Sequence, residues 1–145
     1  NFFDSLRMER TIAIVDDDSQ FLKMLGDVLR ARGFVVTEIA DYHNLGKVLG
    51  QENEQVVLMN PKLDDNSGLD ALREIREQYP HLPLVLATGY RDEITSALKV
   101  ALKIGTYTCL YKPFKIADLL RVLTTIRKKE LRRAIGQPVR EGEVK

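Results

Sequence analysis

The feature of this sequence that most constrains its fold is a fivefold alternation between short apolar runs and segments with helical periodicity. Each apolar run has the length of a strand, and the first, Thr11–Val15, is apolar at every position after Thr11, which is typical of a strand buried on both faces. Each run precedes a stretch whose apolar residues recur every three or four positions, which indicates an amphipathic helix. Strands and helices that alternate in this way form parallel sheets, because each helix carries the chain back across the sheet.

The predicted elements can be assigned to residue ranges. We expect five strands, at Thr11–Val15, Val35–Ile39, Val56–Met59, Leu84–Ala87 and Thr108–Tyr111. We expect five helices, from Ser19 to near Gly33, from about Tyr42 to Gly50, from Gly68 to Tyr79, over a segment ending at Gly105, and from about Ile116. The predicted fold class is therefore α/β, a single doubly wound (βα)5 domain with a five-stranded parallel sheet.

The composition limits the chain to one such domain and argues against several other classes of protein. Of 145 residues 44% are hydrophobic and 30% are charged, so a chain of this size can bury a core and is not of the disordered type. The 22 Lys and Arg residues are balanced by 21 Asp and Glu, so no overall field attracts nucleic acid or an anionic membrane. No apolar run approaches the length of a membrane span, and the lone Cys109 is typical of a reducing compartment, so we expect a cytoplasmic location.

We expect the domain to cover residues 10–129. Residues 1–9 are interpreted as an N-terminal extension or a remnant of cloning, with Met8 as a candidate native start. Residues 130–145 are interpreted as a helical extension followed by a flexible tail, because Leu131 continues the apolar spacing of the last helix.

Polar residues stand where the predicted strands end. In open parallel sheets, functional groups gather beyond the carboxyl ends of the strands. These ends carry Asp16 and Asp17 after the first strand, Asn60 after the third, Thr88 after the fourth and Lys112 after the fifth. The second strand ends at residues 40–41 and offers nothing distinctive.

Asp16 and Asp17 predict a magnesium site. Adjacent carboxylates repel each other and are tolerated mainly around a hard cation. Magnesium is usually held by one or two carboxylates together with phosphate oxygens, so a phosphoryl group is the expected ligand. The Lys112 ammonium and the Thr88 hydroxyl are suited to hold the remaining phosphoryl oxygens.

With these residues the chain resembles the receiver domain of bacterial two-component response regulators. The motifs that carry the resemblance are Ile14-Val15-Asp16-Asp17-Asp18, Gly68, Ala87-Thr88-Gly89 and Lys112-Pro113-Phe114. Each motif is weak alone, but their order and spacing together are specific. The resemblance implies a flavodoxin-like receiver fold and a non-enzymatic role in signal transduction by phosphorelay.

The resemblance also implies roles for individual residues. Asp16 and Asp17 would bind Mg2+, to which Lys62 would add its backbone carbonyl. Thr88 would be the switch hydroxyl and Lys112 the phosphoryl-binding ammonium. The partners would be a sensor histidine kinase or phosphotransfer protein, and an output domain, downstream protein or second copy bound through the face of the fourth helix, fifth strand and fifth helix. Nucleic acid would be contacted only through an output domain outside this chain.

The phosphoacceptor position departs from the family pattern, because Asn60 stands where the family has aspartate. An acyl phosphate forms on a carboxylate oxygen, and a neutral amide is a poor nucleophile. We therefore expect no phosphorylation at Asn60 and weaker Mg2+ binding, since the cluster has lost one negative charge. Asn60 is either an engineered substitution or the mark of a natural pseudo-receiver, and the sequence leaves both open.

Cys109 occupies the position of the family's switch aromatic, so the usual coupling between an aromatic ring and Thr88 is in doubt. We expect neither Tyr107 nor Tyr111 to replace that ring, because they are predicted to point to the other side of the sheet or to lie out of register.

Other functions are also open at this point. The three acids contain the Asp-x-Asp pattern of haloacid dehalogenase-like magnesium-dependent phosphatases, although Gln20 stands where that motif prefers Thr or Val. A protein interaction module that works without phosphate is another alternative. In the simplest alternative the acids serve as helix caps, and Asp18 or Ser19 is the expected cap of the first helix.

Overall fold

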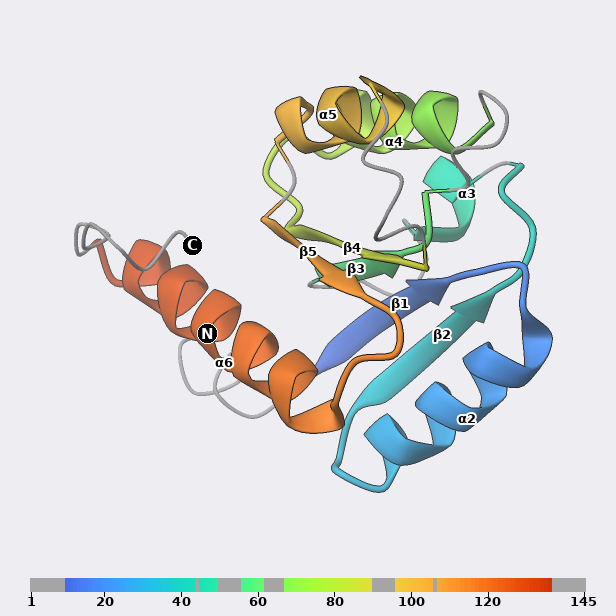
Figure 1. Ribbon diagram of the computed structural model, residues 1–145. Coiled ribbons are helices and arrows are strands. Elements are labelled where there is room, and N and C mark those ends of the chain that lie inside the picture. Colours follow the sequence, from blue (N-terminus) through green and yellow to red (C-terminus); the bar gives the residue numbers. More distant parts are fainter. Residues whose placement is uncertain are drawn as a thin grey trace.

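A computed structural model of the chain describes residues 10–43, 45–49, 56–61, 67–89, 96–105 and 107–136. One parallel sheet is built from β1 (Thr11–Val15), β2 (Val35–Ile39), β3 (Val56–Met59), β4 (Leu84–Thr88) and β5 (Thr108–Tyr111). The strand order is β2-β1-β3-β4-β5, and all neighbouring strands run parallel (Figure 1). The predicted doubly wound α/β fold with a five-stranded parallel sheet is confirmed.

The helices are α2 (Ser19–Arg30), α3 (Leu45–Leu49), α4 (Ser67–Gln78), α5 (Ser96–Lys103) and α6 (Ile116–Ala134). The predicted start of the second helix at Tyr42 is wrong. Asp41 accepts a hydrogen bond from the backbone N–H of His43 at 2.9 Å, so the chain makes a turn before α3 begins.

The sheet separates two apolar layers. In β1, Ile12 and Ile14 face α2 and α6, whereas Ala13 and Val15 face α3, α4 and α5. Figure 1 shows these two sets of helices on opposite faces of the sheet. Because successive side chains of a strand point to opposite faces, a strand covered on both faces must be apolar throughout, as β1 is after its first residue.

The strand order places a natural crevice beside the end of β1. Since β1 pairs with both β2 and β3, the chain leaves β1 in one direction along the sheet and later returns to its other side. In sheets of this type ligands bind outside the carboxyl ends at the point where the strand order reverses. Asp16 and Asn60, which follow β1 and β3, border this point.

Helix α6 is longer than the sheet that it covers. Its side chains Leu119, Leu123 and Ile126 are buried against the sheet, whereas the last residues of the helix are exposed. Figure 1 shows the second half of α6 running on past the beginning of β1. None of the helices in the described ranges combines the length and apolar character that a bilayer crossing requires.

Arg76 of α4 holds together the loops that lead into β4 and β5. Its guanidinium donates hydrogen bonds to five backbone carbonyls, those of Tyr79, Pro80, Leu82, Ile104 and Gly105, at 2.9–3.2 Å. Backbone carbonyls buried away from water need such partners, and a charged donor makes the bonds stronger.

Replacement of Arg76 should therefore destabilise the fold. We expect Arg76→Gln to lower the free energy of unfolding by about 2–3 kcal/mol, because several carbonyls lose a charged donor at once. The control is Arg73→Gln, whose partner Asp70 is exposed and 3.6 Å away, and which should change the free energy by less than about 0.5 kcal/mol. Urea denaturation measures both variants, and equal losses would show that Arg76 is not a structural clamp.

Candidate functional site

Asp16 is the centre of the candidate site. Its side chain is 2% exposed. Its Oδ1 accepts hydrogen bonds from the backbone N–H of Asp18 at 3.0 Å and from Nδ2 of Asn60 at 3.5 Å. Its Oδ2 accepts from Nζ of Lys112 at 2.5 Å. A buried carboxylate is costly unless it is paired and hydrogen-bonded, so these contacts are what permits the charge at this position.

The backbone places the three side chains at one edge. The N–H of Asp16 donates to the carbonyl of Ile39, and that of Asn60 donates to the carbonyl of Val15, at 3.0 and 2.9 Å. The N–H of Lys112 donates to the carbonyl of Thr88 at 2.8 Å. The parallel hydrogen-bond ladders thus continue one residue beyond the strands, and this continuation fixes where the polar side chains leave the sheet.

The ammonium of Lys112 is held between a carboxylate and an aromatic ring. Its Nζ lies 3.7 Å from the centroid of the Phe21 ring, at the beginning of α2. Phe21 packs edge-on against Phe114, with ring centroids 6.3 Å apart and an interplanar angle of 79°. A cation over an aromatic face is stabilised by the quadrupole of the ring, so the two rings help to position the ammonium.

The side chain of Asn60 faces the Asp16 carboxylate. An aspartate at position 60 would place a second carboxylate there. Its Nδ2 donates toward Asp16, and its backbone carbonyl accepts a hydrogen bond from the hydroxyl of Tyr42. Two ionised carboxylates at this separation would repel each other unless a cation lay between them. The amide replaces that repulsion with a hydrogen bond.

The other two acids of the first motif have different positions. Asp18 is the N-cap of α2, and its Oδ1 accepts hydrogen bonds from the backbone N–H groups of Gln20 and Phe21, both at 3.1 Å. Of the two residues expected as the cap, Asp18 or Ser19, the structure shows that Asp18 caps α2. Asp17 lies between the buried Asp16 and the helix cap Asp18, and it is exposed at the edge of the sheet.

Thr88 and Lys62 complete the set of predicted site residues. Thr88 is completely buried at the end of β4, and its backbone meets that of Lys112. Lys62, predicted to lend a carbonyl to a metal ion, lies outside the described residues. The structure thus brings Asp16, Asn60 and Lys112 together, with Thr88 joined to them through the backbone.

Cys109 lies away from this edge. It pairs with Leu86 in the sheet and packs half-buried against the core cluster under α3, α4 and α5. Tyr111 packs against the same cluster, because residues two apart in a strand share a face. Of the two predicted alternatives, Tyr111 therefore does not point to the other side of the sheet but lies two positions out of register with Cys109. Tyr107 precedes β5 and packs on the opposite face, as predicted. Burial raises the pKa of the Cys109 thiol, and a hydrogen bond from Tyr111 opposes part of this rise.

Sequence reasoning missed two side chains that shape the site. The end of the second strand was expected to offer nothing, yet Tyr42 follows it closely and binds the backbone of Asn60. Phe21 reads in the sequence as part of the apolar stripe of α2, but its ring lies under the Lys112 ammonium. The sequence signal that could have found them is an aromatic residue in the segment that follows a strand, as Phe21 follows β1 and Tyr42 follows β2.

The oxygen atoms at this edge are of the kind that Mg2+ prefers. Asp16 and Asp17 provide carboxylates and Asn60 an amide oxygen, which are hard ligands. Among the described residues, however, no group of three or more His, Cys, Asp or Glu could hold a metal ion. The oxygen donors present fit a magnesium ion that keeps several waters, and such an ion would share the Asp16 carboxylate with Lys112.

Comparisons with known proteins agree with this geometry. A family model described as response regulator receiver domain matches residues 12–124. The photosynthetic apparatus regulatory protein RegA of Rhodobacter capsulatus is 33% identical over 122 residues, covering 83% of this chain and 65% of RegA. The acid tolerance regulatory protein ActR of Rhizobium meliloti is 34% identical, covering 83% of this chain and 61% of ActR. The chain thus spans less than two thirds of the length of either relative.

Solved structures share the fold. A response regulator receiver domain protein from Clostridium thermocellum has 25% identity and a TM-score of 0.72, covering 83% of this chain and 95% of that one. A response regulator protein from Burkholderia pseudomallei, described with a phosphorylated aspartic acid, a calcium ion and citrate, has 23% identity and a TM-score of 0.70, covering 90% of this chain and 76% of that one. The likeness to the second structure shows a common fold.

Removal of the Lys112 ammonium should destabilise the domain. We expect Lys112→Met to lower the free energy of unfolding by about 2–4 kcal/mol, because the buried Asp16 carboxylate loses its cation. The double variant Asp16→Asn/Lys112→Met should lose less than the sum of the two single variants, since no buried charge remains unpaired. The matched control is Lys115→Met, an exposed lysine of the same loop, which should have little effect. Urea denaturation tests the coupling, and additive losses would contradict it.

The reactivity of Cys109 should depend on pH in a way that reports its burial. Because burial raises the pKa of this thiol, the folded protein should carry less thiolate at a given pH than the unfolded chain. We therefore expect the alkylation rate with iodoacetamide to rise at higher pH in the native protein than in urea. Cys109 is the one cysteine of the sequence, so the adduct mass reports this site alone. If the alkylation rate of the native protein rises at the same pH as in urea, or at a lower pH, the burial of Cys109 is contradicted.

Proposed function

This chain belongs to the response regulator receiver domain family, and from that premise we propose that it is a two-component receiver domain made non-phosphorylatable by Asn60. Receiver domains of this family are signalling modules that work with histidine kinases or phosphotransfer proteins and with output domains. The proposal assigns the phosphoacceptor position to residue 60 and the metal-binding and phosphoryl-binding roles to its neighbours at the edge of the sheet.

The observation that carries the proposal is the contact of Asp16 with both Asn60 and Lys112. Oδ1 of Asp16 lies 3.5 Å from the Asn60 amide nitrogen, and Oδ2 lies 2.5 Å from the Lys112 ammonium. A phosphoryl group on a side chain at position 60 would therefore have an acidic metal ligand and a cation within a few ångströms. Catalysis of phosphoryl transfer needs this combination of positioning and charge neutralisation.

Asn60 blocks the covalent step while leaving the surroundings in place. Transfer to an aspartate would form a bond between a carboxylate oxygen and phosphorus as the donor's leaving group departs with its electron pair. The amide is uncharged and lacks the nucleophilic carboxylate. The hydrogen bond from Asn60 to Asp16 supports a receiver held in an unphosphorylated arrangement.

Magnesium is the cofactor proposed for this site. Asp16 and Asp17 would hold it through carboxylate oxygens, together with the backbone carbonyl of Lys62. When bound, the ion would neutralise charge on the phosphoryl oxygens. Asn60 should weaken the binding because one negative charge is absent. A calcium ion and a phosphorylated aspartate are described for the Burkholderia pseudomallei protein, which shares this fold.

Thr88 and the face around α5, β5 and α6 are proposed to carry the output. The Thr88 hydroxyl would hold a phosphoryl oxygen, for which the buried side chain must become accessible.

Val100 and Leu102 of α5 are 37% and 39% exposed, which supports a partner-binding role for the face around α5, β5 and α6. An output domain, a downstream protein or a second copy is the proposed partner. Nucleic acid would be reached only through an output domain, as the DNA-binding transcriptional regulator NtrC of Proteus hauseri, a longer relative, illustrates by its name.

Cys109 at the position of the switch aromatic is proposed to exclude the usual output coupling through that residue. Its side chain packs against the core cluster and has no ring to move between buried and exposed states.

The alternative of a haloacid dehalogenase-like phosphatase is not retained. Residues 12–124 match the receiver family, and Asp18, the second acid of the Asp-x-Asp pattern, is engaged as a helix cap.

Restoring the carboxylate should restore phosphorylation. We expect Asn60→Asp to gain one phosphoryl group from acetyl phosphate in the presence of Mg2+, because the nucleophile is then placed beside Asp16 and Lys112. The chain with Asn60 should gain none. Intact-mass spectrometry measures the addition, and fragmentation locates it.

Two controls make the experiment specific. The variant Asn60→Ala should stay unmodified, and EDTA should prevent modification of Asn60→Asp. A folded Asn60→Asp protein that takes up no phosphoryl group, or modification of the chain with Asn60, would overturn the proposed role of this position.

A further inference from the structure

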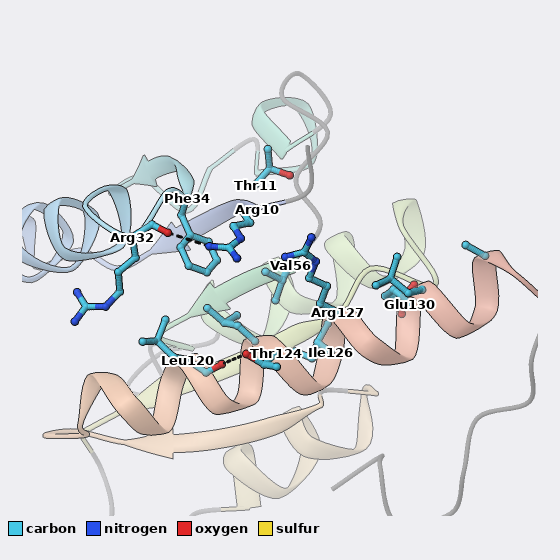
Figure 2. A pocket seen from close by; sticks show the side chains of 13 residues that line it. Arg10, Thr11, Arg32, Phe34, Val56, Leu120, Thr124, Ile126, Arg127 and Glu130 are labelled. Carbon is cyan, nitrogen blue, oxygen red and sulfur yellow. Dashed lines mark hydrogen bonds between the residues drawn. The ribbon is translucent and has the colours of Figure 1, made fainter. Parts of the chain in front are cut away.

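A cavity lies at the end of the sheet opposite to Asp16. Its volume is about 540 Å³, and it opens between the beginning of the sheet and the second half of α6 (Figure 2). Its walls come from Arg10 and Thr11 at β1, Phe34 before β2, Val56 at the start of β3 and α6 from Leu120 to Ala134. Nothing in the proposed phosphoryl chemistry uses this space, since that chemistry is confined to the carboxyl ends of the strands.

The inner surface of the cavity is apolar. Its apolar lining includes Phe34, Val56, Leu123, Ile126 and Leu131. A cavity of this size with a mostly apolar lining and a few polar groups is typical of sites for small molecules. The cavity can therefore take the apolar body of a ligand.

The charged groups around the cavity are mainly basic. Among the described residues that line it, three are arginines, Arg10, Arg32 and Arg127, and one is an acid, Glu130. In Figure 2 the side chain of Arg127 rises from α6 toward the start of β1, where Arg10 lies, whereas the side chain of Arg32 points away. The positive charge at the cavity thus comes chiefly from two walls, β1 and α6.

Arg10 is held in position before any ligand arrives. Its Nη1 donates to the backbone carbonyl of Arg32 at 3.0 Å, and its guanidinium carbon lies 5.7 Å from the centroid of the Phe34 ring. One hydrogen bond to a carbonyl uses only one of the five N–H donors of a guanidinium. A group already oriented in this way binds a ligand with less loss of conformational entropy.

We propose that this cavity binds a small amphipathic carboxylate, with its apolar chain against Phe34, Val56 and Leu123 and its carboxylate at Arg10 and Arg127. Charge complementarity selects an anion over a cation or a neutral lipid. The planar guanidinium matches the two oxygens of a carboxylate, and the apolar floor selects a ligand with a chain over a bare anion. A ligand bound in this way connects the start of β1 to the projecting half of α6.

The test is a titration of the whole chain with decanoate, followed by calorimetry and by NMR. We expect saturable binding with shifts at Val56 and Leu123. Decanol and acetate should each bind at least about tenfold more weakly, because one lacks the charge and the other the chain. Decyltrimethylammonium, of opposite charge, should not bind measurably.

Matched variants locate the carboxylate. Arg127→Gln and Arg10→Gln should each weaken decanoate binding by about tenfold, which corresponds to about 1.4 kcal/mol for a lost charge-assisted contact. Lys128→Gln removes an exposed charge from the next position of α6, which does not line the cavity, and should leave affinity within about twofold. Circular dichroism and thermal unfolding establish that each variant is folded.

Several outcomes would overturn the proposal. These are the absence of saturable decanoate binding, equal affinity for decanol, unchanged affinity in both arginine variants, and shifts confined to other parts of the protein. Binding of an acidic apolar peptide at these residues without binding of decanoate would instead assign the cavity to a protein partner. None of these results depends on phosphorylation at position 60, so they are distinguishable from failure of the proposed receiver function.

Discussion

The buried carboxylate of Asp16 is the constraint on which the polar end of this molecule depends. It lies after the interior strand β1 and is almost completely buried, and its charge is tolerated because the Lys112 ammonium, the backbone N–H of Asp18 and the side-chain amide of Asn60 surround it. These partners belong to segments that follow β1, β3 and β5. A single charged group thus contacts distant parts of the chain. Asp16 can be buried only because the sheet order brings these partners to it.

Asn60 changes both the chemistry and the electrostatics of this cluster. The amide supplies a hydrogen-bond donor to Asp16 where a second carboxylate would repel it, and under the proposed function it also removes the nucleophile of phosphoryl transfer. The Asp16 carboxylate is paired with the Lys112 ammonium as its cation.

Helix α6 connects the two ends of the sheet. It begins shortly after Lys112 and Phe114, which form part of the polar site, and its second half lines the apolar cavity at the opposite end. Its middle is anchored to the sheet by Leu119, Leu123 and Ile126. A change in packing at either end of the sheet would therefore meet the same helix.

The alternation of apolar runs and helical stripes was enough to predict the sheet and the edge at which Asp16, Asn60 and Lys112 meet, because parallel strands carry their carboxyl ends to one side. The sequence could not show that Tyr42 reaches the backbone of Asn60, or that the Phe21 ring lies under Lys112. These contacts depend on the exact placement of helices and loops over the sheet. The facing of Tyr111 and the cavity beside α6 were likewise decided by tertiary structure, since the first depends on where the pleat of β5 begins and the second on how far a helix runs past the strands.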